Sequence, residues 1–147
     1  MENVFEKQGI QFKIIDNEMI PAVLDFMWEH FIPDEPISRS LGITRNWFAD
    51  DVFFVDALKD GCSIAALDKD RNFIGARIGM RKMNLMPVPE NTLKCLPIMV
   101  KLFTLLEHDV LKIFNKFGCD LIYEGKAVCS ARTSGVRGLG HRVMQEG

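Results

Sequence analysis

Two short apolar runs in the middle of the chain limit the folds that it can adopt. Ser63–Leu67 and Asn72–Ile78 are separated only by the polar run Asp68–Arg71. Aspartates and other polar residues between two such runs favour a tight turn, so the pattern predicts a β-hairpin. A hairpin alone is marginally stable in water, and the flanking segments must therefore cover its apolar side.

Helical patterns flank this hairpin on both sides. Apolar residues recur at helical spacing in Ile20–Phe31 and Asn46–Lys59, and a longer stripe with charges on its other face runs over Leu96–Phe117. Further strands are expected at Phe12–Ile15 and Lys126–Ser130, and a last helix begins near the end of the sequence. The order β-α-α-β-β-α-β, then a turn and a helix start, predicts an α/β fold of the α+β kind with a mixed sheet.

The composition is that of a globular domain without a nucleic-acid or membrane signature. The chain has 147 residues, 48% of them apolar, which predicts one domain with a core. Its 18 basic and 20 acidic residues argue against a nucleic-acid binder. No apolar stretch is long enough for a membrane span, and no leader pattern is visible. The cysteines lack zinc or redox spacing, so we expect a cytoplasmic protein with reduced thiols and no metal.

A glycine-rich turn with basic neighbours lies near the end of the sequence. Arg137-Gly138-Leu139-Gly140 follows a predicted strand and precedes a predicted helix. Glycines let backbone N–H groups approach an anion closely, a helix start adds free donors, and Arg142 adds a charge. The turn lacks the features of the NTPase phosphate loop and of the dinucleotide fingerprint. From the residues alone, a phosphate-binding turn and a plain connecting turn both stay open.

A second candidate site lies in the segment Phe31–Pro36, which contains Asp34 and Glu35 side by side. Its prolines are expected to end the preceding helix and to make Phe31–Ile37 a stiff connection. A carboxylate in a fixed position can act as a general base. From the residues alone, a solvated acidic loop is the favoured interpretation of this segment.

Taken together, these residues resemble the GNAT acyltransferase superfamily, and within it the insect arylalkylamine N-acetyltransferases, the dopamine N-acetyltransferase-like group. The resemblance rests on the order of elements, the Asp-Glu-Pro segment, the hairpin, the long amphipathic helix and the Arg-Gly-Leu-Gly turn. It implies a GNAT-like fold over nearly the whole chain. It also implies a transferase that moves an acetyl group from acetyl-CoA, its co-substrate, to a small aromatic amine. Phe31 and Trp47 are candidates to line the amine pocket.

The resemblance also implies residue roles. The glutamate of Asp-Glu-Pro is the general base in this family, which points to Glu35. The family's turn, Arg/Gln-x-x-Gly-x-Gly/Ala, binds the pyrophosphate of acetyl-CoA. Arg137 and Gly140 match its first two fixed positions, whereas Arg142 departs from the third. The strand before the turn pairs with the pantetheine arm. The cofactor-binding candidates are Ala131, Arg132, Arg137, Gly138, Leu139, Gly140, His141 and Arg142.

The family's sheet continues beyond the point where this sequence stops, with another strand, a helix and a final pair of strands. The resemblance therefore implies that residues 1–147 form a single, incomplete acetyltransferase domain that lacks the C-terminal strands. Its last strand would be an open edge through which the chain could self-associate. The alternative hypothesis is a catalytically inactive truncated form, or a gene-model fragment, that acts, if at all, as an interaction module.

Overall fold

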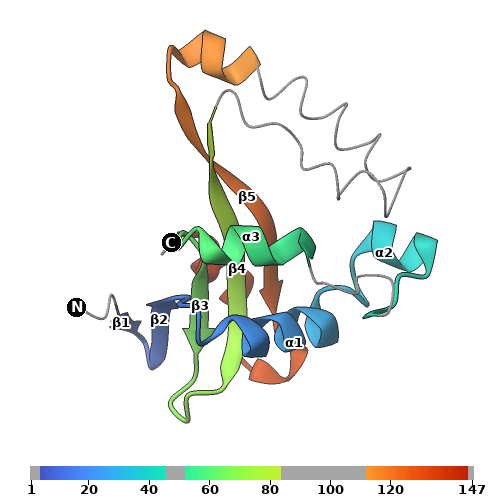
Figure 1. Ribbon diagram of the computed structural model, residues 1–147. Coiled ribbons are helices and arrows are strands. Elements are labelled where there is room, and N and C mark those ends of the chain that lie inside the picture. Colours follow the sequence, from blue (N-terminus) through green and yellow to red (C-terminus); the bar gives the residue numbers. More distant parts are fainter. Residues whose placement is uncertain (1–3, 46–51, 84–111, 146–147) are drawn as a thin grey trace. The chain divides into compact units, whose positions relative to one another are not determined.

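The computed structural model describes residues 4–45, 52–83 and 112–145, and Figure 1 shows their arrangement. The described residues form a five-stranded sheet in which neighbours along the chain are also neighbours in space. Its strands are β1 (Val4–Lys7), β2 (Ile10–Ile14), β3 (Ile64–Leu67), β4 (Phe73–Met83) and β5 (Leu121–Ser130). The helices are α1 (Ile20–His30), α2 (Pro36–Leu41), α3 (Val52–Lys59), the 3-10 helix η2 (Arg132–Ser134) and α6 (Leu139–Gln145).

The predicted hairpin and the α+β class are confirmed. β3 and β4 pair antiparallel, as do β1 with β2 and β2 with β3. The carboxylate of Asp68 closes the hairpin turn, because its Oδ1 accepts the backbone N–H of Asn72 at 2.8 Å. β5 forms one edge of the sheet among the described residues. Self-association through that edge stays a prediction.

The structure differs from the sequence prediction at Pro36. Pro36 does not simply stiffen a connection: it is the first residue of α2, where a missing N–H costs nothing because that group has no partner within the helix. β1 was not predicted either. It joins β2 through Gln8 and Gly9, both at positive φ, which is the backbone conformation of a tight two-residue hairpin turn.

Several predicted elements lie partly outside the described residues. The helix predicted over Asn46–Lys59 is confirmed as α3 from Val52 onward. Of the long predicted helix, residues 112–117 are described and helical, and Gly118 follows them at a φ of +59°. Trp47 and most of the predicted loop Met83–Asn91 are not among the described residues. No described helix has the length and apolar content that crossing a membrane requires.

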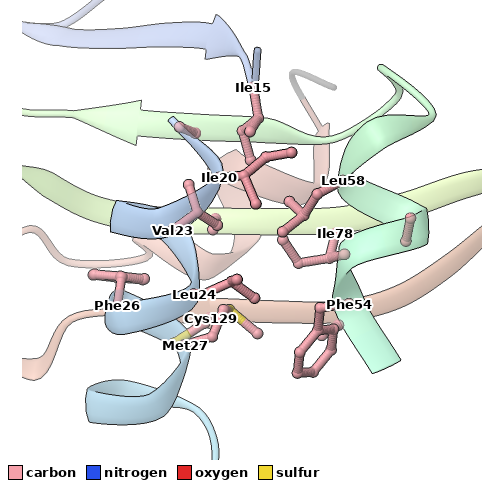
Figure 2. Close-up of a cluster of buried hydrophobic side chains, with 14 of the residues drawn as sticks. Ile15, Ile20, Val23, Leu24, Phe26, Met27, Phe54, Leu58, Ile78 and Cys129 are labelled. Atoms are coloured by element: carbon pink, nitrogen blue, oxygen red, sulfur yellow. The ribbon is translucent and has the colours of Figure 1, made fainter. Parts of the chain in front are cut away.

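The described chain divides into two compact units, residues 1–80 with 125–147 and residues 81–124. In the larger unit, apolar side chains are buried on both faces of the sheet. Figure 2 shows the cluster between the sheet and helices α1 and α3. A second cluster joins α6 to the opposite face (Figure 1, α6 in red). That second cluster consists of Ile10, Phe12, Ile64, Ala66, Ile74, Leu139 and Val143.

Candidate functional site

The Glu35 carboxylate is held at the start of α2. The carbonyl of Phe31 accepts the N–H groups of Asp34 and Glu35, both at 3.0 Å, which turns the chain after α1. Glu35 has the extended backbone that a following proline favours, and its side chain points toward the first turn of α2. Oε1 accepts the N–H of Ile37 at 3.0 Å and Oε2 accepts that of Ser38 at 2.5 Å. Glu35 is therefore the N-cap of α2, a role that its position before a helix-starting proline could have indicated.

These hydrogen bonds also determine the ionisation of Glu35. Burial by itself would raise the pKa of this carboxyl, but hydrogen bonds from the N–H of Ile37 and from Ser38 outweigh burial, so the pKa lies below its ordinary value of 4.5. The side chain is therefore an anion at neutral pH. An ionised carboxylate has about four lone-pair positions, so each oxygen can still accept a proton or a further hydrogen bond.

An ion pair joins the two candidate sites that the sequence predicts. Nη2 of Arg132 lies 2.6 Å from Oδ1 of Asp34, although the two residues are 98 positions apart in the chain. Their side chains are 80% and 45% exposed, so the pair contributes little to stability. Its importance is geometric, because it shows that the Asp-Glu-Pro segment lies next to the first residue of η2, shortly after the end of β5.

Both backbone polar groups of Ala131 form hydrogen bonds within the fold. Its N–H donates to the carbonyl of Ile74 at 2.8 Å, and its own carbonyl accepts the N–H of Ser134 at 3.2 Å. Its side chain is buried. The carbonyl keeps one lone pair for another donor, whereas the N–H is already used. A ligand that pairs with the backbone here would therefore meet Ala131 as an acceptor only.

The glycine-rich turn is more tightly integrated into the core than the sequence indicated. Gly138 has a φ of +72°, and α6 begins directly after it. Leu139 is only 2% exposed and packs in the second cluster, so its backbone alone can face a ligand. Gly140 lies inside the helix, and a Cβ there would meet nothing nearer than Oγ of Ser130 at 3.9 Å. Arg137 and His141 are exposed.

The Cys129 thiol is buried in the core, and its chemistry does not suit a nucleophile at neutral pH. Burial, together with the negative charge of Asp34, raises its pKa to about 12. A thiol with so high a pKa is not a thiolate and does not act as a nucleophile at neutral pH. Within the described ranges, no three His, Cys, Asp or Glu side chains gather as metal ligands.

Comparison with known proteins gives matches in structure. No family model and no curated sequence matches the chain. Arylalkylamine N-acetyltransferase 2 from Aedes aegypti is 21% identical with a TM-score of 0.78. An agmatine N-acetyltransferase is 18% identical with a TM-score of 0.79. In both comparisons, 95% of this chain and 68% of the other are covered. The chain has the fold of the GNAT N-acetyltransferases. The polyamine N-acetyltransferase of Drosophila melanogaster, 17% identical with a TM-score of 0.72, is similar over 93% of this chain.

Within this GNAT fold, the predicted residues fall into three groups. The carboxylates of Asp34 and Glu35 follow α1, and Asp34 contacts Arg132. Ala131 belongs to the end of the sheet. The other candidates belong to the turn and α6, namely Arg137, Gly138, Leu139, Gly140, His141 and Arg142. The roles assigned to these residues stay predictions. Sequence patterns gave no sign of the β4 residues that contact α6, which are described below.

Proposed function

We propose that this chain is an acetyl-CoA-dependent N-acetyltransferase that acts on small arylalkylamines. The observation that carries the proposal is the Asp34–Arg132 ion pair. It joins the segment that holds the proposed base, Glu35, to the 3-10 helix η2, which lies between β5 and the proposed cofactor turn. The GNAT fold supports the reaction class, because its solved examples include N-acetyltransferases of arylalkylamines, agmatine and polyamines.

The turn suits the anionic part of acetyl-CoA. Apart from adjacent residues and the helix's own backbone, no described atom lies within 4 Å of a Cβ built at Gly138, and only a hydroxyl oxygen does so at Gly140. The space beside both glycines is therefore open to a ligand. Arg137 and Arg142 supply positive charge and His141 a further donor, and such groups bind phosphate through charge-assisted hydrogen bonds. These residues would hold the pyrophosphate. When bound, acetyl-CoA supplies the acetyl group as a reactive thioester.

Glu35 has the properties needed to remove the proton of the amine. An alkylamine with a pKa of about 10.4 is protonated at pH 7 and must lose a proton to become a nucleophile. Glu35 is ionised, fixed by two backbone hydrogen bonds, and can accept that proton directly or through water. The amine nitrogen then bonds to the acetyl carbon while the carbon–sulfur bond breaks, and the leaving thiolate takes up the second proton, which the nitrogen loses as it becomes an amide. Holding both reactants in place can lower the activation barrier by roughly 7–11 kcal/mol.

Aromatic side chains next to the carboxylates favour an arylalkylamine as substrate. Phe31 lies three residues before Asp34. Its ring packs edge-on against that of Phe54, with the ring centroids 6.0 Å apart and the planes at 82°. Phe31 is half-buried, so part of its ring is accessible. An apolar aromatic surface beside an anion suits a ligand with an aromatic ring and a charged amine.

Two measurements on the 147-residue chain test the proposed function. Calorimetric titration with acetyl-CoA is expected to give micromolar binding. Steady-state kinetics are expected to give a higher kcat/KM for phenethylamine than for agmatine, which lacks an aromatic ring. Absence of acetyl-CoA binding would contradict the proposed activity for this chain and favour a catalytically inactive form. A preference for agmatine would contradict the substrate class alone.

Gly140→Ala separates a ligand-binding role of the turn from a structural one. The added methyl has room, and alanine favours a helix over glycine by about 1 kcal/mol, so the free energy of unfolding is expected to stay constant or rise. The same methyl lies where the backbone is proposed to approach the pyrophosphate, and we expect acetyl-CoA affinity to fall about tenfold.

Calorimetry and urea denaturation of the same samples measure both effects of Gly140→Ala. Gly125→Ala is the matched control, because a Cβ at Gly125 has room as well, with no described atom within 4 Å apart from its chain neighbours, and this glycine lies outside the turn. Equal acetyl-CoA affinity in Gly140→Ala and the parent chain would remove Gly140 from the cofactor site.

A further inference from the structure

Helix α6 contacts the sheet through two apolar side chains one helical turn apart. Leu139 and Val143 are 2% and 0% exposed, and both pack in the cluster on the face opposite α1 and α3. Residues four apart lie on the same side of a helix, so this face of α6 is the one that meets the sheet. The position of α6 on the sheet therefore also determines the position of the turn from Arg137 to Gly140, which begins the helix.

Gly75 of β4 faces this helix. A Cβ built at Gly75 would lie 3.0 Å from Cγ2 of Val143 and 3.3 Å from the carbonyl oxygen of Cys129 on β5. At these distances the neighbouring atoms would have to move by a few tenths of an ångström to make room for a side chain at Gly75. The φ of Gly75 is not positive, so this position does not require the unusual backbone conformation that glycine can adopt. The absence of a side chain is what lets α6 approach the strand.

A β-bulge in β4 determines that Gly75 faces α6. Ala66 is opposite Gly75 in the register and Leu67 is opposite Phe73, so Ile74 is an extra residue in β4. The carbonyl of Ile74 accepts the N–H of Ala131, which connects the same point of β4 to the end of β5. The bulge thus joins the strand that receives α6 to the strand that leads into the turn.

Arg77 lies two residues further along β4 and contacts the residue after Val143. Its Nη1 donates to the backbone carbonyl of Met144 at 3.3 Å, at the end of α6 where carbonyl groups lack helical partners. This bond holds the end of the helix against β4. A group inserted under Val143 would therefore tilt α6 about that end and displace its beginning, which carries the turn.

We propose that Gly75 is a positioning residue for the cofactor turn: by leaving β4 without a side chain beneath Val143, it sets the position of α6 and hence of Arg137–Gly140. The inference rests on the proposed function, because it assigns the turn a ligand. Gly75 itself does not contact the ligand. Its effect on binding passes through Val143 and α6.

Gly75→Ala and the double variant Gly75→Ala/Val143→Ala test the inference. A misplacement of 1 Å can cost an enzyme about 100-fold in rate, and for a shift of a few tenths of an ångström we expect the Kd for acetyl-CoA to rise about fivefold. Removing Cγ2 in the double variant eliminates the shortest contact and is expected to restore most of the affinity. Gly125→Ala, a glycine of β5 with open space around it, is expected to bind like the parent chain.

The position of α6 is followed independently of any ligand by the amide NMR signals of residues 139–145. These signals are expected to shift in Gly75→Ala and to return toward their original positions in the double variant. Binding is measured at a temperature at which every variant is folded, so that a loss of stability alone cannot lower the affinity. Unchanged amide signals in Gly75→Ala would overturn the inference, as would unchanged acetyl-CoA affinity despite shifted signals.

The failure of the proposed function is distinguishable from the failure of this inference. If the parent chain does not bind acetyl-CoA, the proposed function is contradicted and the inference falls with it, whatever the NMR signals show. If the parent chain binds and the double variant does not recover, then Val143 is not the residue through which Gly75 acts, and the inference alone is wrong.

Discussion

Glu35→Gln is expected to lower kcat by about 10²- to 10⁴-fold with no change in acetyl-CoA affinity, because it removes the proton acceptor and leaves the proposed cofactor turn intact. The amide oxygen of glutamine can still accept one of the two N–H groups of Ile37 and Ser38, so α2 keeps part of its cap. Steady-state kinetics with a saturating amine, together with calorimetry of acetyl-CoA, measure the two parameters. Glu18→Gln, on an exposed residue before α1, is the control.

A kcat for Glu35→Gln within twofold of the parent value would exclude Glu35 as the base.

The dependence of stability on pH gives a second comparison of the parent chain with Glu35→Gln. The pKa of Glu35 is lowered in the fold, so its cap stabilises the chain above about pH 4.5 and is lost as pH falls through the lower folded pKa. The free energy of unfolding should thus fall more in the parent chain than in Glu35→Gln over this acid range. Between pH 6 and 9 Glu35 stays ionised, and any rise in rate reflects deprotonation of the amine.

Met27→Ala is expected to lower the free energy of unfolding by about 2–5 kcal/mol, the usual cost of truncating a large buried side chain to alanine. Met27 is 0% exposed and lies in the cluster of α1, α3 and the sheet (Figure 2). Because the total stability of a domain is about 5–15 kcal/mol, the loss is a large part of it. Urea denaturation followed by circular dichroism measures the change.

Met83→Ala is the matched control for Met27→Ala. Met83 is 57% exposed, so its truncation is expected to change the free energy of unfolding by less than about 0.5 kcal/mol. The backbone carbonyl of Met27 also accepts the N–H groups of Phe31 and Ile32, which are the first residues after α1. Met27 is thus hydrogen-bonded to the segment that contains Asp34. Equal effects of the two substitutions would show that the described core does not stabilise the chain.

Local patterns in the sequence were sufficient for the hairpin, whereas Glu35 became a candidate base only through the family resemblance, and that role stays a prediction. The polar run Asp68–Arg71 encodes a turn in adjacent residues, and the structure confirms it through Asp68. The Asp-Glu-Pro segment pointed to Glu35, but the stiff connection predicted around it was wrong at Pro36. A proline can end one helix or begin the next. Which of the two it does depends on whether the residue before it can cap the new helix.

The sequence by itself determined the order of most elements, the position of the hairpin, and the residue types near the proposed site, because periodicity and turn chemistry act between neighbours in the chain. Only the tertiary structure decided which distant residues meet. Asp34 and Arg132 form their ion pair because the residues of α1 and of the end of β5 pack in one buried cluster, and no local pattern contains that information. Gly75 shows the same limit: its missing side chain has meaning only once the bulge at Ile74 and the packing of Val143 bring α6 against β4.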